Sequence, residues 1–341
     1  MNLSVVELMA LADRDPAWLQ QALQRAIELE LSTLPPYLCG YWCLKDPSSY
    51  PAAQILKIIY QEMFHIGLAC NMLSATGKRP EVLKGFQSIA YPGPLPGGVV
   101  PTCDGKLVPC DRNFQVMLGF DDFHAFAWMA AQIEYPEHPV PRQMVFGLEA
   151  TFPTIGQFYD AILQAFQDSN DEIPYDLQNQ RTGTLGLFAI DDVCKAIAAI
   201  QQIKQQGEGG DKNPFSGPNQ LSHFYAFGEL YNLHKYRFDP ITEQGDFDGD
   251  PISLPYDQVY EMTPVPLRGY PAPPAEVIDF DHAFTRMLCH LDRAWAPGGA
   301  AELALATVEM PALTAKATQL LSKEIKRTDA PGIYGPQFKL I

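Results

Sequence analysis

The chain has 341 residues, of which 47% are hydrophobic and 19% are charged. This composition is typical of a globular protein and excludes a disordered chain. It holds 24 lysines and arginines against 40 aspartates and glutamates, so the formal net charge of −16 makes nucleic acids and anionic membranes poor partners.

The sequence also predicts a protein that neither crosses a membrane nor is secreted. No apolar run reaches the roughly 18 residues that a membrane span needs. The N-terminal residues lack a basic start and include Glu7, unlike a secretory signal. The seven cysteines are odd in number, scattered and free of any CxxC motif, which favours reduced thiols over a disulfide framework. We therefore expect a cytoplasmic protein.

Apolar residues recur at spacings of three and four along most of the chain, which predicts helices. These cover about residues 17–44, 51–76, 120–133, 154–168, 186–206, 216–236, 276–294 and 298–326. Pro35 and Pro36 predict a kink or a short break in the first helix, and Gly77 predicts the end of the second. No alternating pattern of strands is present.

The predicted fold is therefore all-α, with long loops inserted between the helices. The first long loop covers residues 78–118 and the second, which is acidic and rich in proline, covers 238–275. We place a helical bundle at 1–236. The acidic loop and a C-terminal helical pair, at 237–341, are expected to pack on the bundle as one structural unit.

Ionisable side chains lie on faces of these helices that should be buried. Glu30 continues an apolar stripe of the first helix, whereas Glu28 lies on a polar side and is expected to face solvent. A lone buried carboxylate costs several kcal/mol unless it is paired, protonated or bound to a metal. Glu62 and His65 form a Glu-x-x-His pattern, which places both side chains on one face of the second helix.

Glu30, Glu62 and His65 together match half of the dinuclear carboxylate site of ferritin-like bundles. Such oxygen and imidazole ligands suit iron, manganese or zinc. A Glu-x-x-His pattern by itself is more typical of a solvated helix face, but with Glu30 we favour a metal half-site. Gln220 and His223 repeat the pattern with glutamine in place of glutamate. His223 is as compatible with a buried core histidine as with a metal ligand.

The segments that carry these residues resemble a known family. Residues 26–38 (AIELELSTLPPYL) and 62–77 (EMFHIGLACNMLSATG) resemble the first two helices of the ferritin-like domain of iminophenyl-pyruvate dimer synthases. Those enzymes act in violacein- and rebeccamycin-type bisindole biosynthesis, and the same domain also occurs in stand-alone proteins. Shorter matches follow in the family's order, at residues 91–92, 133–137, 154–159, 206–209, 221–224 and 335–338.

The resemblance implies a ferritin-like four-helix core with a metal site. The positions that match the family's ligands are Glu30, Glu62, His65 and His223. Gln157 and Gln220 stand where the third and fourth helices of the family carry glutamate.

Replacing two glutamates by glutamine changes the charge balance of the expected site. Glu30 and Glu62 balance one divalent ion, and a second ion would leave positive charge in a medium of low dielectric constant. We therefore expect one divalent metal, iron or manganese, or none. Asp160, three residues after Gln157, is the alternative source of a compensating carboxylate.

Three functions remain open at this stage. The favoured one is a metal-dependent oxidoreductase of secondary metabolism that acts on a small organic, amino-acid-derived substrate. The second is a metal-free enzyme in which buried Glu and His side chains catalyse a cyclisation or isomerisation as acids and bases, with Gln157 and Gln220 orienting the substrate. The third is a non-catalytic binding protein on a degenerate metal site. A homo-oligomer is compatible with all three.

Overall fold

The computed structural model describes residues 3–98, 102–103, 106–109, 114–136, 154–207, 209 and 213–341. Its helices are α1 (Val5–Met9), α2 (Pro16–Trp42), α3 (Tyr50–Ala75), α4 (Val82–Gln87), α5 (Phe123–Ile133), α6 (Ile155–Asp168), α7 (Val193–Gly207), α8 (His223–Asn232), α9 (Ala275–Ala294) and α10 (Ala300–Ser322). Among the described residues, the strands form three antiparallel hairpins, β1 (Thr102–Cys103) with β2 (Lys106–Pro109), β3 (Phe215–Gly217) with β4 (Gln220–Leu221), and β5 (Arg237–Asp239) with β6 (Gln244–Asp246).

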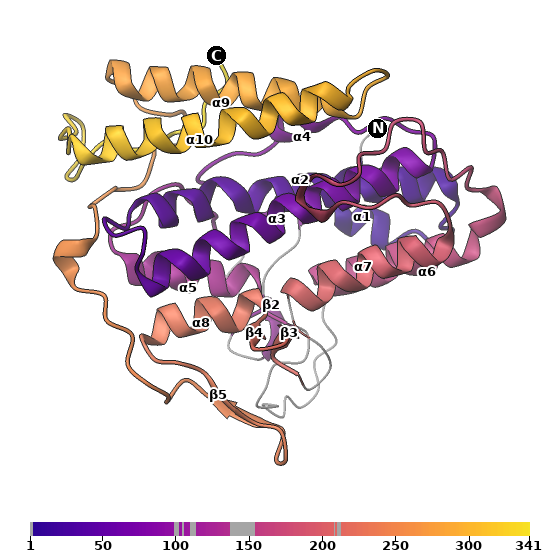
Figure 1. Cartoon of the computed structure of the whole chain (residues 1–341), viewed down its shortest axis with the longest axis horizontal. Helices are drawn as coiled ribbons and strands as arrows, with labels where there is room; N and C mark the ends of the chain where they lie inside the picture. The colour runs from indigo at the N-terminus through magenta and orange to yellow at the C-terminus, as the bar shows by residue number, and fades with distance from the viewer. Residues whose placement is uncertain are drawn as a thin grey trace.

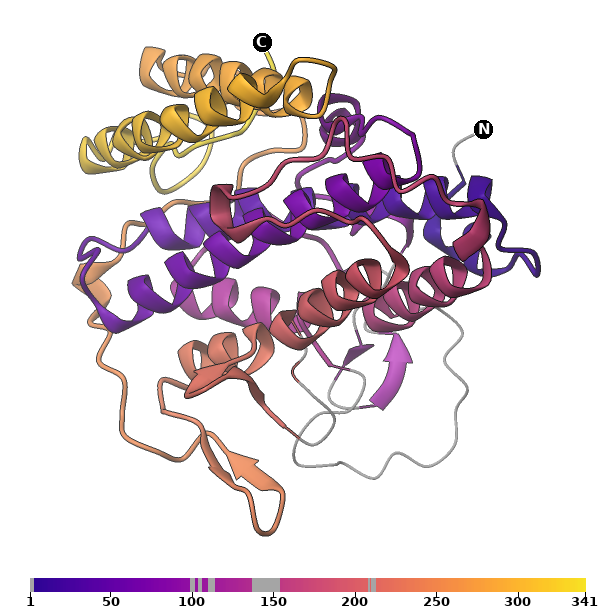
Figure 2. The ribbon, with the colours of Figure 1, turned by 45° about the vertical axis from the view of Figure 1, so that its right-hand side comes forward.

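The helices lie in three layers, with α2 and α3 in the middle one (Figure 1). On one side of this pair α5 packs with α8, and α6 packs with α7, so that two pairs of short helices follow the length of α2 and α3. On the other side α9 and α10 form an antiparallel pair, with α4 between α2 and α9 (Figures 1 and 2). The all-α prediction is confirmed.

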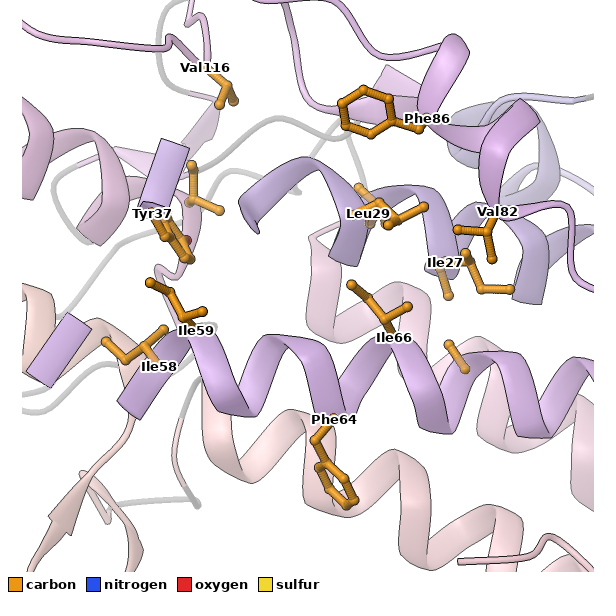
Figure 3. Close-up of a cluster of buried hydrophobic side chains, with 14 of the residues drawn as sticks. Ile27, Leu29, Tyr37, Ile58, Ile59, Phe64, Ile66, Val82, Phe86 and Val116 are labelled. Atoms are coloured by element: carbon orange, nitrogen blue, oxygen red, sulfur yellow. The ribbon is translucent and has the colours of Figure 1, made fainter. Parts of the chain in front are cut away.

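The middle pair begins at well-formed helix caps. The side chain of Asp15 accepts a hydrogen bond from the backbone N–H of Trp18, and Pro16 occupies the first helical position of α2. Ser49 caps α3 in the same way. Apolar side chains such as Ile27 and Ile66 fill the interface of the two helices (Figure 3).

The break predicted at Pro35 and Pro36 is absent, because α2 continues through both residues to Trp42. A proline in a helix leaves the carbonyl four residues earlier without its N–H partner. For Pro36 that carbonyl belongs to Ser32, and the hydroxyl of Tyr91 donates a hydrogen bond to it at 2.8 Å. A residue from the long loop therefore supplies the hydrogen bond that the proline removes.

Two other helix predictions differ from the structure at their N-terminal ends. α7 begins at Val193, seven residues later than expected, and the segment before it contains a 3₁₀ turn at Thr184–Gly186. The helix predicted at 216–236 is shortened to α8, because residues 215–221 form the β3–β4 hairpin. The hairpin turn includes Asn219 with φ of 56°, a left-handed conformation that ends helical geometry.

The prediction that Glu28 faces solvent is wrong. Its side chain is buried, forms an ion pair with Arg25 and lies against Gly85 of α4. Burial raises the pKa of this carboxyl group, and Arg25 partly opposes that effect. The polar side of α2 is covered because α4 packs on it, which the periodicity of α2 alone does not reveal.

One continuous cluster of buried apolar side chains joins the bundle to α9 and α10. The division of the chain at residue 236 stays a prediction. No described helix combines the length and the apolar character that crossing a lipid bilayer requires.

Candidate metal centre

Four side chains that the sequence analysis selected come together in the interior of the bundle. Glu30 comes from α2, Glu62 and His65 from α3, and His223 is the first residue of α8. All four are buried. His65 Nδ1 lies 3.5 Å from Glu30 Oε2 and 3.7 Å from Glu62 Oε1, and the two imidazole rings stack with centroids 5.6 Å apart.

A third carboxylate, Glu134, joins this cluster, and the sequence analysis did not select it as a ligand. Its Oε2 lies 3.4 Å from His223 Nδ1. Glu134 is the C-terminal cap of α5, and Pro136 follows two residues later. The residue lies in the segment 133–137 that resembles the family, so the resemblance contained the signal for this residue. Periodicity predicted the end of this helix at residue 133, but it does not show which way the side chain of the capping residue points.

The five side chains form two overlapping sets of three. Glu30, Glu62 and His65 make one set, and Glu62, Glu134 and His223 make the other. Within each set, one ligand atom per residue lies within 4.8 Å of the others. Glu62 belongs to both sets, and its Oε1 is 2.9 Å from His223 Nδ1. A shared carboxylate between two ligand sets is the arrangement that bridges two metal ions in dinuclear carboxylate sites.

Hydroxyl groups hold the outer oxygen of each carboxylate. Thr33 Oγ1 donates to Glu62 Oε2 at 2.7 Å, the phenol of Tyr159 donates to Glu30 Oε1, and that of Tyr37 donates to Glu134 Oε1. The second oxygen of each carboxylate is left facing the imidazoles. Burial, reinforced by the neighbouring carboxylates, holds the pKa values of both tyrosines well above the usual range, so they remain donors.

Two glutamines fix the orientation of the histidines. His65 Nε2 lies 2.7 Å from the Oε1 atom of Gln206, and His223 Nε2 lies 3.3 Å from that of Gln61. A carbonyl oxygen accepts a hydrogen bond, so in the neutral imidazole that a metal requires, Nε2 carries the proton and Nδ1 directs its lone pair at the carboxylates. This arrangement is how a neighbouring group selects the tautomer of a metal-binding histidine.

The buried Nδ1 atom of His223 tests whether these residues fit a metal. It has no hydrogen-bond partner, although Glu62 Oε1 lies only 2.9 Å away, because the oxygen is not placed where an N–H would point. A buried nitrogen lone pair beside two carboxylate oxygens is unfavourable without a cation between them. Three carboxylates and two imidazoles are ligands that suit iron or manganese, so the residues fit.

The pKa values reflect the crowding of negative charge in this site. Burial, with the charge of Glu134, raises the pKa of Glu62 to about 7. Burial opposes a charge on His223, but Glu134 and Glu62 outweigh it and raise the pKa of His223 to about 10. The pKa of His65 is raised because Glu30 outweighs the effect of burial. Both histidine shifts show that the site favours positive charge at its centre.

Gln157, Gln220 and Asp160 lie elsewhere than the sequence analysis expected. Gln157 is exposed in the first turn of α6, where its side chain accepts a hydrogen bond from the backbone N–H of Thr154. Gln220 lies in β4 opposite Gly217, before α8 begins. Asp160 is exposed and pairs with Lys204 at 2.5 Å. Glu134, which follows the last residue of α5, is the carboxylate that lies in the cluster where Gln157 was expected.

The prediction of a single metal rested on two carboxylates, whereas Glu30, Glu62 and Glu134 bring three to the cluster. Three carboxylates leave about one of the four positive charges of two divalent ions uncompensated, instead of about two. The number of ions therefore stays a prediction.

The comparisons with known proteins agree with this geometry. The family model described as Ferritin-like matches residues 23–232, which include every residue of the two ligand sets. The chain belongs to the ferritin-like family.

A crystal structure of a ferritin-like protein from Caulobacter vibrioides is similar to this member of the family, with a TM-score of 0.60 and 21% sequence identity. The match covers 94% of this chain and 97% of the other, and at this identity it supports the fold alone. The comparison with curated proteins finds no match.

Proposed function

We propose that this ferritin-like protein is a metal-dependent oxidoreductase of secondary metabolism. The proposal includes its resemblance to the ferritin-like domain of iminophenyl-pyruvate dimer synthases. The observation that carries the proposal is the pair of buried ligand sets that share Glu62. A small organic, amino-acid-derived molecule is the proposed substrate. Cytoplasmic localisation and a homo-oligomeric state stay predictions.

In this proposal one divalent ion is held by Glu30, Glu62 and His65, and a second by Glu62, Glu134 and His223. Iron with open coordination positions supplies the ability to activate dioxygen. This differs from the single metal that the sequence analysis favoured, because Glu134 adds the third carboxylate.

The surrounding residues would orient the ligands and control protons. Thr33, Tyr37 and Tyr159 each hold one carboxylate oxygen, so the other oxygen is aimed inward before any ion arrives. Gln61 and Gln206 keep the histidine protons on the outer nitrogens. The burial of the ligands keeps bulk water away from the site, which strengthens every electrostatic interaction within it.

Dioxygen consumption by protein loaded anaerobically with Fe²⁺ tests the oxidoreductase proposal. We expect rapid consumption by the native protein and by Gln157→Ala, whose side chain is exposed at α6. Glu62→Ala should abolish dioxygen consumption, because it removes the ligand that both sets share. Glu134→Ala should reduce consumption strongly, because it removes a ligand from one set.

Iron binding without dioxygen consumption would contradict the oxidoreductase function and leave the metal site intact. Failure to bind Fe²⁺ or Mn²⁺ would instead favour the metal-free alternative, in which the buried Glu and His side chains act as acids and bases.

A further inference from the structure

A large apolar cavity lies between the bundle and the C-terminal helical pair. Its volume is about 460 Å³, and its walls come from α2 and α3 on one side and from α9 and α10 on the other. Figure 2 shows these two pairs of helices facing each other. Protein interiors contain few voids larger than a water molecule, which takes up about 30 Å³ in the liquid. Small-molecule sites have volumes of roughly 300–1,000 Å³. The cavity therefore has the size of a ligand site.

The walls of the cavity are uncharged. None of the described residues that line it is an Asp, Glu, Lys, Arg or His. The polar side chains in the lining are Tyr41, Trp42, Tyr60, Trp295, Thr307 and Thr314. The hydroxyl of Thr307 already donates to the backbone carbonyl of Leu303 at 2.9 Å. Water has few partners in such a space, and a charged ligand would lose its hydration without compensation.

The cavity is separate from the metal centre. On α3, Glu62 and His65 face the metal centre, whereas Leu56, Tyr60 and Met63 line the cavity from another face of the same helix. On α2, Glu30 belongs to the metal centre and Leu34 to the cavity. None of the side chains in the two ligand sets is among those that line the cavity.

The lining can admit and adapt to a small molecule. Tyr60 is 53% exposed although it lines the cavity, so the cavity reaches solvent beside this residue. Met63, Met287 and Met310 come from three of the four surrounding helices. Methionine side chains are flexible and polarisable, which lets them adjust to ligands of different shape. Because helices form both walls, the space suits a small molecule and not a second protein chain.

We propose that this cavity binds an uncharged, predominantly apolar small molecule, independently of the metal centre. If an apolar space of this size is empty, the side chains that line it lack the dispersion contacts that a bound molecule would make. A bound apolar molecule restores them.

The neutral fluorescent probe phenylnaphthylamine tests the proposal on the native protein. We expect saturable binding of about one probe per chain, as one cavity of this volume allows. Decanol should displace the probe, whereas diaminodecane, a dication of the same chain length at neutral pH, should not. Absence of saturable binding, or equal displacement by both compounds, would overturn the proposal.

Variants that fill the cavity identify the binding site. Met310→Trp on α10 and Leu56→Trp on α3 add volume from opposite walls. Each should weaken probe binding by about tenfold or more, a loss of at least about 1.4 kcal/mol, because the added ring occupies space that the probe needs. Leu305→Trp is the matched control on α10, since Leu305 is 45% exposed and does not line the cavity.

Metal content and circular dichroism should be the same in all these proteins. If both filling variants fold and bind the probe as the native protein does, the cavity is not the site and the proposal fails. The readout of the cavity proposal is probe affinity, whereas that of the metal proposal is metal binding. Failure of one proposal can therefore be distinguished from failure of the other.

Discussion

At the scale of single residues, the site depends on groups that are not ligands themselves. His65 and His223 would present the wrong nitrogen to the carboxylates if Gln206 and Gln61 did not accept their Nε2 protons. The hydroxyl groups of Thr33, Tyr37 and Tyr159 orient the carboxylates, because each donates a hydrogen bond to one carboxylate oxygen. The site is therefore arranged for metal by hydrogen bonds from several helices.

Replacing Gln206 by leucine should weaken metal binding by about 10- to 100-fold, the usual effect of losing a group that orients a metal-binding histidine. Gln206→Glu should retain most of the affinity, because a carboxylate also accepts the Nε2 proton. Gln205→Leu is the matched control, since Gln205 is exposed on the same turn of α7. Mn²⁺ affinity measured by chelator competition checks this, and equal affinity of Gln206→Leu and the native protein would contradict it.

Sequence reasoning selected four of the five members of the two ligand sets and missed Glu134. Glu30, Glu62 and His65 lie within α2 and α3, where periodicity fixes the buried face. Glu134 caps α5, and Gln206 lies at the end of α7. The ends of these two helices were predicted within one residue, but periodicity does not show which way a side chain at a helix end points. Gln157 was selected because the resemblance places the glutamate of the third helix at that position.

At the scale of elements, α2 keeps its helical form through two prolines with help from outside the helix. The hydrogen bond from Tyr91 to the Ser32 carbonyl replaces the one that Pro36 cannot make. This contact ties the long loop to the helix that carries Glu30.

Tyr91→Phe should lower the free energy of unfolding by about 1–3 kcal/mol, the cost of leaving a buried carbonyl without a partner. In a Pro36→Ala background the same change should cost less, because residue 36 then donates its own N–H to Ser32. Urea denaturation of the four proteins measures both costs. An equal cost in the two backgrounds would show that the Tyr91 hydroxyl acts elsewhere.

The C-terminal pair is attached to the bundle by a second buried polar network. Asn71 of α3 accepts hydrogen bonds from the Arg181 backbone and from Trp295 Nε1, both at 2.9 Å. The guanidinium of Arg181 donates to the carbonyls of Ala294 and Ala296, at the C-terminal end of α9. A cation at this end also interacts favourably with the helix dipole.

Arg181→Met should destabilise the protein by about 1.5–3 kcal/mol, since hydrogen bonds from a charged donor are lost to buried carbonyls. Hydrogen exchange should increase first in α9 and α10. Arg286→Met is the control, because the Arg286–Glu309 pair is exposed and such pairs contribute roughly 0–1 kcal/mol. Equal destabilisation by Arg181→Met and Arg286→Met would show that Arg181 does not attach the C-terminal helices to the bundle.

At the scale of the whole molecule, the layer formed by α4, α9 and α10 determines which sides of α2 are buried. The side of α2 that looks polar is buried under α4, and α9 and α10 enclose an apolar cavity against the bundle. α9 and α10 were predicted at about the right residues, whereas α4 lies in the segment 78–118 that was predicted to be a loop. Their position on α2 and α3 depends on contacts between distant segments, which periodicity does not encode.

The attachment of the C-terminal segment should depend on pH through Asp281. This buried side chain accepts hydrogen bonds from Gln337 Nε2 at 2.7 Å and from the Lys339 backbone N–H at 3.1 Å. Burial raises its pKa from 3.8 to about 6, although both hydrogen bonds oppose the shift. A raised pKa in the folded state means that folding favours the protonated acid, so its contribution to stability is present below about pH 4 and is lost as pH rises through about 6.

The expected loss from this one group is up to about 3 kcal/mol over that interval. Asp281→Asn cannot ionise, so its stability relative to the native protein should increase between about pH 4 and about pH 7. Urea denaturation at several pH values gives this difference. A difference that is constant with pH would contradict the assignment to Asp281.

The metal content per chain tests whether two ions bind to the two ligand sets. Plasma mass spectrometry measures it after anaerobic loading with Fe²⁺ or Mn²⁺ and removal of excess ion. Two ligand sets predict about two ions in the native protein and in Gln157→Ala, about one in Glu134→Ala, and none held tightly in Glu62→Ala. About one ion in the native protein, unaffected by Glu134→Ala, would contradict the shared arrangement, and no ion at all would contradict the metal centre itself.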